Sequence, residues 1–335
     1  MKYALALAIA FALFFPLAAA AITIDTVPVG NAGNAADNPG NGLFGRVTSD
    51  YRIATTEVTN AQYAEFLSAK AVSDPLDLYN TRMGSNAYGG ITRSGSDGSY
   101  TYAPTTDMGN KPVSYVSWYD AIRFANWLHN GQGAGDTETG AYTLLGGTPT
   151  PTNGLSITRN AGATWFLTSE NEWYKAAYYD ATLADYWEYP TRSDSVPTVA
   201  VANSVGDISN PGTNVVNYFS AADWNGQDGN VTTVGSAGPL SQSYYGTSDQ
   251  GGNVWEWNEA LISGSVRGAR GGSWFNNPFN LQAADRNSAD PSVESDYLGF
   301  RVVSIAVPEP STTLLAVVAF AALPRCRKSV PHNRV

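Results

Sequence analysis

The spacing of apolar residues predicts a strand followed by a helix between residues 51 and 70. Apolar and β-branched residues at 53–58 give the first part a strand-like pattern. Thr59 and Gln62 are three residues apart, as in a capping box, where each side chain accepts a hydrogen bond from a free backbone N–H at the helix start. Three apolar residues then fall on one face of the helix, namely Tyr63, Phe66 and Leu67.

Two further helices are indicated by the same signals. Ser117 can cap a helix that runs to about Leu128. The mostly inward-facing residues of that helix are Trp118, Ile122, Ala125 and Trp127. A short buried strand at 165–167 precedes a second capping box, made by Ser169 and Glu172. The helix that it starts holds Trp173, Ala176 and Ala177.

The rest of the chain is rich in turn-forming residues. Residues 22–45 predict an edge strand and then a loop, 71–110 predict turns, and 181–250 predict short strands joined by long polar loops. No internal repeat is visible, and no Pro/Ser-rich linker divides residues 22–305. We therefore expect one α+β domain over 22–305, with few short helices and much irregular chain.

Residues 1–21 have the pattern of a secretory signal peptide. Lys2 precedes an apolar run, and small residues at 19–21 offer a cleavage site. An uncleaved membrane anchor is the alternative, although the apolar run is short for a spanning helix. The pattern predicts export.

Residues 306–329 predict a sorting tail, followed by a short C-terminal tail at 330–335. Pro308-Glu309-Pro310 precedes an apolar run at 312–323, and a basic cluster follows at 325–328. This order resembles the PEP-CTERM tail of bacterial exopolysaccharide-associated proteins. The resemblance implies the export and PEP-CTERM sorting machinery as partners. It also implies an inner-membrane tether before sorting, then the cell envelope or extracellular matrix. A plain tail anchor is the alternative.

Charge and rare residues exclude several functions. The 335 residues include 19 Lys and Arg against 29 Asp and Glu, a formal net charge of −10, so we expect no nucleic-acid partner. Cys326, in the tail, is the only cysteine, so the domain has no disulfide and no cysteine nucleophile. His129 is the only histidine of the domain, and its place at a helix end favours a structural role.

Several blocks occur in an order that is specific for one family. They lie at 56–63, 112–121, 166–173, 251–257, 270–277 and 298–302. Together they resemble the formylglycine-generating enzyme (sulfatase-modifying factor) family, with Thr168 in place of the usual proline. The resemblance implies a loop-rich α+β module related to C-type lectins, with few short helices around small antiparallel sheets.

The reactive cysteines of that family are missing. By motif position, Asn276 and Leu281 stand where the family's enzymes have two cysteines after the Gly-Gly-Ser-aromatic block. Formylglycine formation needs those thiols to hold copper, and soft thiolates suit Cu(I), whereas an amide is a weak ligand and an alkyl chain is none. We therefore expect neither copper nor this activity. Iron-dependent sulfoxide synthesis, the family's second chemistry, needs a histidine cluster that the domain lacks.

The resemblance implies structural calcium in two loops. In the first, the matched positions are Asp249, Gly252 and Val254 (both through backbone carbonyls) and Glu256. In the second they are Asn217, Tyr218 (backbone), Asp228 and Asn230 (backbone). Calcium prefers oxygen ligands, and two carboxylates in the first loop could balance a dication. The alternative is a set of solvated Asx turns.

Aromatic and basic residues of the signature blocks have two interpretations. Trp255, Trp257 and Trp274 could form a platform for a sugar or a peptide, but core packing is the favoured interpretation because Trp buries a large area. Three arginines are expected to be internal tethers to buried carboxylates or carbonyls, namely Arg270, Arg286 and Arg301.

The sequence therefore predicts a non-catalytic binding or structural protein outside the cell. Candidate ligand contacts are Trp274, Asn276 and Arg286, and the candidate ligand is an extracellular polysaccharide or a protein. The alternative is an enzyme of the same fold that uses chemistry without thiols.

Overall fold

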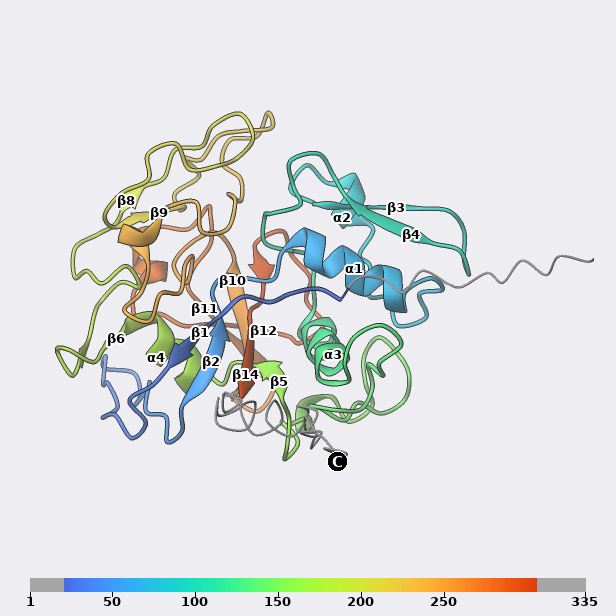
Figure 1. Ribbon diagram of the computed structural model, residues 1–335, viewed down its shortest axis with the longest axis horizontal. Coiled ribbons are helices and arrows are strands. Elements are labelled where there is room, and N and C mark those ends of the chain that lie inside the picture. The colour runs from blue at the N-terminus through green and yellow to red at the C-terminus, as the bar shows by residue number, and fades with distance from the viewer. Residues whose placement is uncertain (1–20, 306–335) are drawn as a thin grey trace, which may run out of the picture. The chain divides into compact units, whose positions relative to one another are not determined.

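The computed structural model describes residues 21–305 (Figure 1). Its strands are β1 (Thr26–Val29), β2 (Tyr51–Ala54), β3 (Ile91–Ser94), β4 (Thr101–Pro104), β5 (Trp165–Leu167), β6 (Tyr179–Asp180), β7 (Asp185–Tyr186), β8 (Thr198–Val199), β9 (Val215–Val216), β10 (Trp255–Ile262), β11 (Val266–Arg270), β12 (Asn287–Ala289), β13 (Leu298–Gly299) and β14 (Val302–Ile305). Its α-helices are α1 (Asn60–Lys70), α2 (Arg82–Ser85), α3 (Trp118–His129) and α4 (Glu170–Tyr178), and short 3-10 helices are η1 (Gly154–Ser156), η2 (Pro239–Ser241) and η3 (Pro278–Leu281). Few short helices and much irregular chain are as expected.

Two four-stranded sheets form the framework. The first has the order β1-β2-β14-β5 and is antiparallel throughout. Val303 of β14 pairs with Ile53 on one side and Phe166 on the other, so the last strand joins the first and middle parts of the chain. All three residues are buried. The sheet therefore depends on contacts between residues far apart in the sequence.

The second sheet carries the signature blocks. Its order is β12-β11-β10-β13, and the pairing of Trp255 with Leu298 is parallel. The β10–β11 register shifts between Trp257 and Leu261, which marks a bulge. The short β8–β9 pair is also parallel, so the sheets are small as expected but not antiparallel everywhere.

The predicted helix starts are confirmed. Gln62 receives a hydrogen bond from the Thr59 N–H over 2.9 Å and donates its own N–H to the Thr59 hydroxyl over 3.3 Å. Ser117 and Ser169 cap α3 and α4 with the same reciprocal geometry. In each case a side chain satisfies backbone donors that have no partner inside the helix.

The main core lies between α1, α3 and the first sheet. Its centre is a group of aromatic rings from α1, α3 and the 298–302 block: Tyr63, Phe66, Phe124, Trp127 and Phe300. Ring centroids of Phe124 and Phe300 are 5.4 Å apart in an edge-to-face arrangement. The apolar face predicted for α1 therefore points inward.

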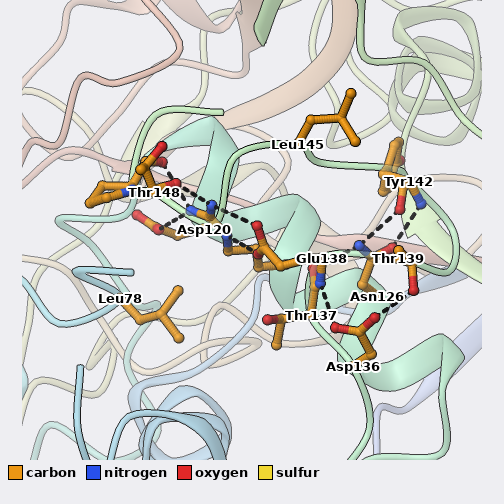
Figure 2. A network of polar contacts seen from close by, with 12 residues as sticks. Leu78, Asp120, Asn126, Asp136, Thr137, Glu138, Thr139, Tyr142, Leu145 and Thr148 are labelled. Atoms are coloured by element: carbon orange, nitrogen blue, oxygen red, sulfur yellow. Dashed lines mark hydrogen bonds and ion pairs between the residues drawn. The ribbon is translucent and has the colours of Figure 1, made fainter. Parts of the chain in front are cut away.

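A buried arginine ties α3 to an irregular loop, whose residues Glu138 and Thr148 are labelled in Figure 2. Arg123 has no exposed surface, and its Nε donates to Glu138 over 2.7 Å. Its other nitrogens donate to the carbonyls of Thr148 and Pro149. One turn further, the Asn126 amide donates to the carbonyls of residues 137 and 142. Side chains of α3 thus satisfy backbone groups of a segment that has little secondary structure.

Two features of the N-terminal part differ from expectation. The first strand covers 26–29 rather than the expected start at residue 22. The stretch at 71–110 contains α2 and a β3–β4 hairpin as well as turns. Gly95 and Gly98 at the hairpin tip have φ of 89° and 82°, which favour glycine, so the turn was recognised but its flanking strands were not.

The predictions for the signal peptide and the sorting tail fall on residues 1–20 and 306–335, outside the described residues. Within residues 21–305, no helix has the length and apolar character needed to cross a membrane.

Candidate functional site

A pair of glycines carries the chain from β11 into the segment of the missing cysteines. Gly271 and Gly272 have φ of 102° and 73°, a conformation that other residues rarely adopt. A Cβ at Gly271 would lie 2.6 Å from the Gln250 carbonyl oxygen, and one at Gly272 would lie 2.7 Å from a Leu281 methyl carbon. Only glycine lets the segment pack this closely.

Neither cysteine position offers a soft metal ligand. The Asn276 Oδ1 accepts a hydrogen bond from the Ser273 hydroxyl over 2.6 Å. Leu281 has no exposed surface and packs with Tyr189, Val216 and Tyr218. The first position therefore holds a hydrogen-bonded amide, and the second belongs to the core.

The first predicted calcium loop contains a buried ion pair. Arg301 donates to both carboxylate oxygens of Glu256, each over 2.6 Å, and both side chains are fully buried. The indole N–H of Trp173 also donates to this carboxylate, over 2.7 Å. One guanidinium thus already balances the charge of Glu256, so this residue fits a calcium ligand poorly.

Asp249, the other acid of that loop, is held by a backbone N–H group. Its Oδ2 accepts from the Gly235 N–H over 2.5 Å, and burial raises its pKa to about 6. Gly252 and Val254 lie between Asp249 and Glu256 in a fully buried turn. A Cβ at Gly252 would lie 2.1 Å from the Asn217 carbonyl oxygen, so the two calcium loops of the prediction are packed against each other.

A third buried carboxylate, Glu57, lies near these groups and was not predicted as a site residue. It is 1% exposed, and neither carboxylate oxygen has a hydrogen-bond partner within residues 21–305. Burial raises the pKa of Glu57 well above its usual range, and the negative charge of Asp249 raises it further, while Arg301 opposes the shift. The neighbourhood thus has three acids, Glu57, Asp249 and Glu256, against the single guanidinium of Arg301.

The second predicted calcium loop is only partly assembled. Asn217 is buried, and its Oδ1 has no partner among the described residues, as would suit an oxygen ligand. Its Nδ2 donates to the Asn230 carbonyl over 2.9 Å, so that carbonyl already has a donor. Tyr218 is buried, whereas Asp228 is exposed. Asn217 and Asn230 are therefore together, and Asn217 is the residue that best fits a cation.

Metal-binding side chains do not cluster anywhere in the described part of the chain, and this includes the three acids near Arg301. Among residues 21–305, no group of three or more His, Cys, Asp or Glu is arranged to hold a metal ion. His129 ends α3, and its Nδ1 lies 2.7 Å from the Thr164 hydroxyl.

A carboxyl pair lies at the start of α3. Asp120 is 3% exposed and accepts from the Ser117 hydroxyl over 2.6 Å, while Glu294 accepts from the Asn80 amide over 2.6 Å. Both line a cavity of about 180 Å³. Burial raises the pKa of Asp120 to about 7; burial and the Asp120 charge raise the pKa of Glu294 to about 8.

The arginines of the signature blocks are internal tethers, as expected. Arg270 and Arg286 both bind the carboxylate of Glu170, at the start of α4. Arg270 is fully buried and lies over the ring of Phe44, and it also donates to the Asp285 carbonyl over 2.6 Å. The Arg286 side chain is 29% exposed, so it is the arginine of this group that solvent can reach.

Aromatic side chains near the cysteine positions divide into two sets. Trp255, Trp257 and Trp274 are buried, which confirms core packing. Phe219, Phe275 and Phe279 are exposed by 63%, 40% and 68%. The remaining phenylalanines of residues 21–305 are buried, so exposed phenyl rings occur only here in the described chain.

A family model for the sulfatase-modifying factor enzyme 1-like domain matches residues 26–306. The chain belongs to this family. The match covers nearly all of the described residues, and it confirms the family resemblance of the signature blocks and the loop-rich α+β fold.

Individual relatives of this sulfatase-modifying factor domain are distant. A hercynine oxygenase of Mycolicibacterium smegmatis is 24% identical over 280 residues, covering 75% of this chain and 52% of that protein. The chain thus spans about half the length of this relative. The crystal structure of CarF superposes with a TM-score of 0.52 at 23% identity, covering 85% of this chain and 99% of CarF. Treponema denticola variable protein 1 gives a TM-score of 0.49 at 19% identity, over 86% and 97% of the two chains. These structural similarities concern the fold.

Proposed function

We propose that this protein is an exported, envelope- or matrix-associated binding or structural module, whose sulfatase-modifying factor domain no longer catalyses an oxidation. The observation that carries the proposal is the state of the two cysteine positions. Leu281 is sealed in the core, and the Asn276 amide is bound to Ser273. Cu(I) favours thiolate and thioether ligands, and neither side chain supplies one.

The exposed side chains around the two cysteine positions support ligand binding there rather than catalysis. The exposed phenyl rings of Phe219 and Phe275 lie beside the cysteine segment, because the backbone of residues 219–220 is hydrogen-bonded to residues 274–276. Aromatic side chains supply large contact areas at binding surfaces. An extracellular polysaccharide or a protein is the proposed ligand, since the ends of the sequence favour export and sorting to the envelope.

The test is an oxidation assay on the purified protein. It is incubated with copper, a reductant, oxygen and a sulfatase-motif cysteine peptide, and the peptide mass is followed. We expect no formylglycine above a metal-free control, with a catalytically active member of the family as the positive control. Formylglycine formed by this protein above the metal-free control would overturn the proposal.

A structural calcium ion is a further part of the proposal. Asn217 supports it, because its buried Oδ1 accepts no hydrogen bond from the described part of the chain, and Asp249 could supply a carboxylate. Differential scanning calorimetry with calcium or with chelator tests this. We expect calcium to raise the melting temperature, since a ligand that binds only the folded state stabilises it. The shift should be lost in Asn217→Ala and kept in Asp228→Ala, whose side chain is exposed. Equal melting temperatures in calcium and chelator would exclude the ion.

A further inference from the structure

We propose that Gln132 holds the N-terminus that export creates, so that the processed chain is fastened to its own domain at Ile22. Ala19 and Ala21 fit the small-residue positions of a signal-peptidase site, which places the cut between residues 21 and 22. Hydrolysis there adds water across the peptide bond and leaves a carboxylate on Ala21 and an α-ammonium group on Ile22. This inference goes beyond the proposed function and shares with it only the predicted export.

A single side-chain amide binds both backbone groups of Ile22. The Ile22 N–H donates to the Gln132 Oε1 over 2.7 Å, and the Gln132 Nε2 donates to the Ile22 carbonyl over 2.9 Å. One amide can satisfy both groups because it offers a donor and an acceptor side by side. Ala21 is exposed, so solvent would take its place after cleavage. The nitrogen that donates to Oε1 is thus the atom that becomes the ammonium group.

The residues that follow Ile22 are also held against the domain. The Gln62 Nε2 on α1 donates to the Thr23 carbonyl over 2.9 Å. The side chains of Ile22 and Ile24 are half-buried and pack against the main core. Figure 1 shows the dark blue chain before β1 running toward α1. Residues 22–24 are therefore bonded and packed from the residue at which the predicted cut falls.

The loop that carries Gln132 is held in shape, and its backbone is strained at this residue. Gln132 has φ of 65° between Gly131 and Gly133, in the left-handed region that residues with a side chain rarely adopt. Its N–H donates to the Trp127 carbonyl over 2.8 Å, and the Trp127 indole N–H donates to the Gly133 carbonyl over 3.1 Å. Within residues 21–305, the Gln132 amide forms hydrogen bonds only with Ile22. A strained residue whose side chain serves one partner points to a role for that contact.

The charge that cleavage creates should strengthen this contact. A hydrogen bond with a charged donor is about twice as strong as one between neutral groups. Lys70 of α1 donates to the same loop, at the Ala134 carbonyl over 3.3 Å, but this contact is exposed, so salt and solvent screen the repulsion between the two cations. The processed chain should therefore gain more stability from Gln132 than a chain that continues upstream of residue 22.

N-terminal sequencing of the full chain, exported from a bacterium, locates the cut. We expect Ile22 as the first residue, and a first residue elsewhere would overturn the inference. An unprocessed chain would overturn it as well and would also count against the predicted export. Neither result affects the oxidation assay, which tests the cysteine positions separately.

Urea denaturation of two forms of the chain tests the role of Gln132. The forms are released from a removable leader, one beginning at Ile22 and the other at Ala20. Gln132→Ala should raise the unfolding equilibrium constant about tenfold or more in the Ile22 form, and clearly less in the Ala20 form. Gln227→Ala is the matched control, because Gln227 is also a half-buried loop glutamine and its amide bonds only to the Asn225 carbonyl. Equal effects of Gln132→Ala in the two forms would overturn the inference.

Two further variants separate the contact from the strain of the loop. Gln132→Gly removes the amide and relieves the left-handed strain, so it should be milder than Gln132→Ala but still affect the Ile22 form more. Gln132→Glu keeps an acceptor and adds a charge that pairs with an ammonium group, so it should be tolerated better in the Ile22 form. Better tolerance of Gln132→Glu in the Ala20 form would show that no ammonium group lies at this residue, against the inference.

Discussion

Glu57→Gln should change the pH dependence of stability in a way that can be calculated in advance. Glu57 is buried without a hydrogen-bond partner among the described residues, and burial together with Asp249 raises its pKa well above its usual range. Its pKa in the unfolded chain is about 4.3. Between those two values the folded protein binds one proton more than the unfolded chain, so the free energy of unfolding must fall as pH rises.

The magnitude follows from this linkage. One group in this situation removes about 1.4 kcal/mol of unfolding free energy per pH unit. Over the two units from about pH 5 to about pH 7 that is about 2.7 kcal/mol as an upper bound, reached only while pH stays below the folded-state pKa. Glutamine resembles the protonated acid and does not titrate. Near pH 5, the unfolding free energies of the variant and the wild type should therefore differ by a constant offset. As the pH rises further, the unfolding free energy of the variant should increasingly exceed that of the wild type.

Urea denaturation at a series of pH values, with chelator present, measures the effect. The quantity to compare is the difference in unfolding free energy between Glu57→Gln and wild type. The pH dependence that other groups such as Asp249 contribute largely cancels in this difference. Glu65→Gln is the matched control, because Glu65 is exposed on α1 and its difference should stay flat. A flat difference for Glu57→Gln as well would refute the reasoning, because Glu57 would then be ionised and compensated in the folded state.

Three other substitutions test the buried groups around the site. Arg301→Met should lower the unfolding free energy by about 3–5 kcal/mol in urea melts, because it leaves Glu256 buried without the guanidinium of its partner. Adding Glu256→Gln should recover part of that loss. If the double variant recovers nothing, the ion-pair argument is contradicted. Leu281→Ala should cost about 2–5 kcal/mol by the same assay, and a loss below about 1 kcal/mol would mean that Leu281 is not core. The raised pKa of Glu294 predicts that stability falls as the pH rises from about 5 to about 8, and Glu294→Gln should make this fall shallower. If thermal melts of the variant keep the wild-type slope, the Glu294 carboxyl is not protonated in the folded protein.

Local signals in the sequence were sufficient for three of the described helices, α1, α3 and α4. Thr59, Ser117 and Ser169 cap α1, α3 and α4 as predicted, because capping depends on residues three apart. The hairpin strands β3 and β4 were missed because each has a single buried residue, Ile91 or Tyr102, among exposed or half-buried ones, which leaves no clear apolar pattern. Element boundaries in such stretches are set by cross-strand pairing, which a linear pattern does not contain.

The site was harder to predict because its electrostatics are non-local. Motif position placed Glu256 among calcium ligands, yet its nearest cation is the guanidinium of Arg301, 45 residues later. Glu57 looked like part of a strand, and nothing near it in sequence shows that Asp249 and Arg301 surround it. The arginines were thus predicted correctly as tethers, while the partner of each charged group depended on the folded arrangement.

The segment after the glycine pair shows how a family scaffold can keep its shape while its chemistry changes. At one end, Leu281 fills a site next to Val216 and Tyr218 and adds apolar burial that a thiol would supply less well. At the other, Phe275 and the strained Phe219 keep apolar surface exposed, which opposes stability. If the two ends have these separate roles, Leu281→Ala should lower the unfolding free energy, whereas Phe219→Gly should raise it or leave it unchanged. A loss of stability in Phe219→Gly would mean that the segment acts as one structural unit, and the exposed rings would then need a structural explanation.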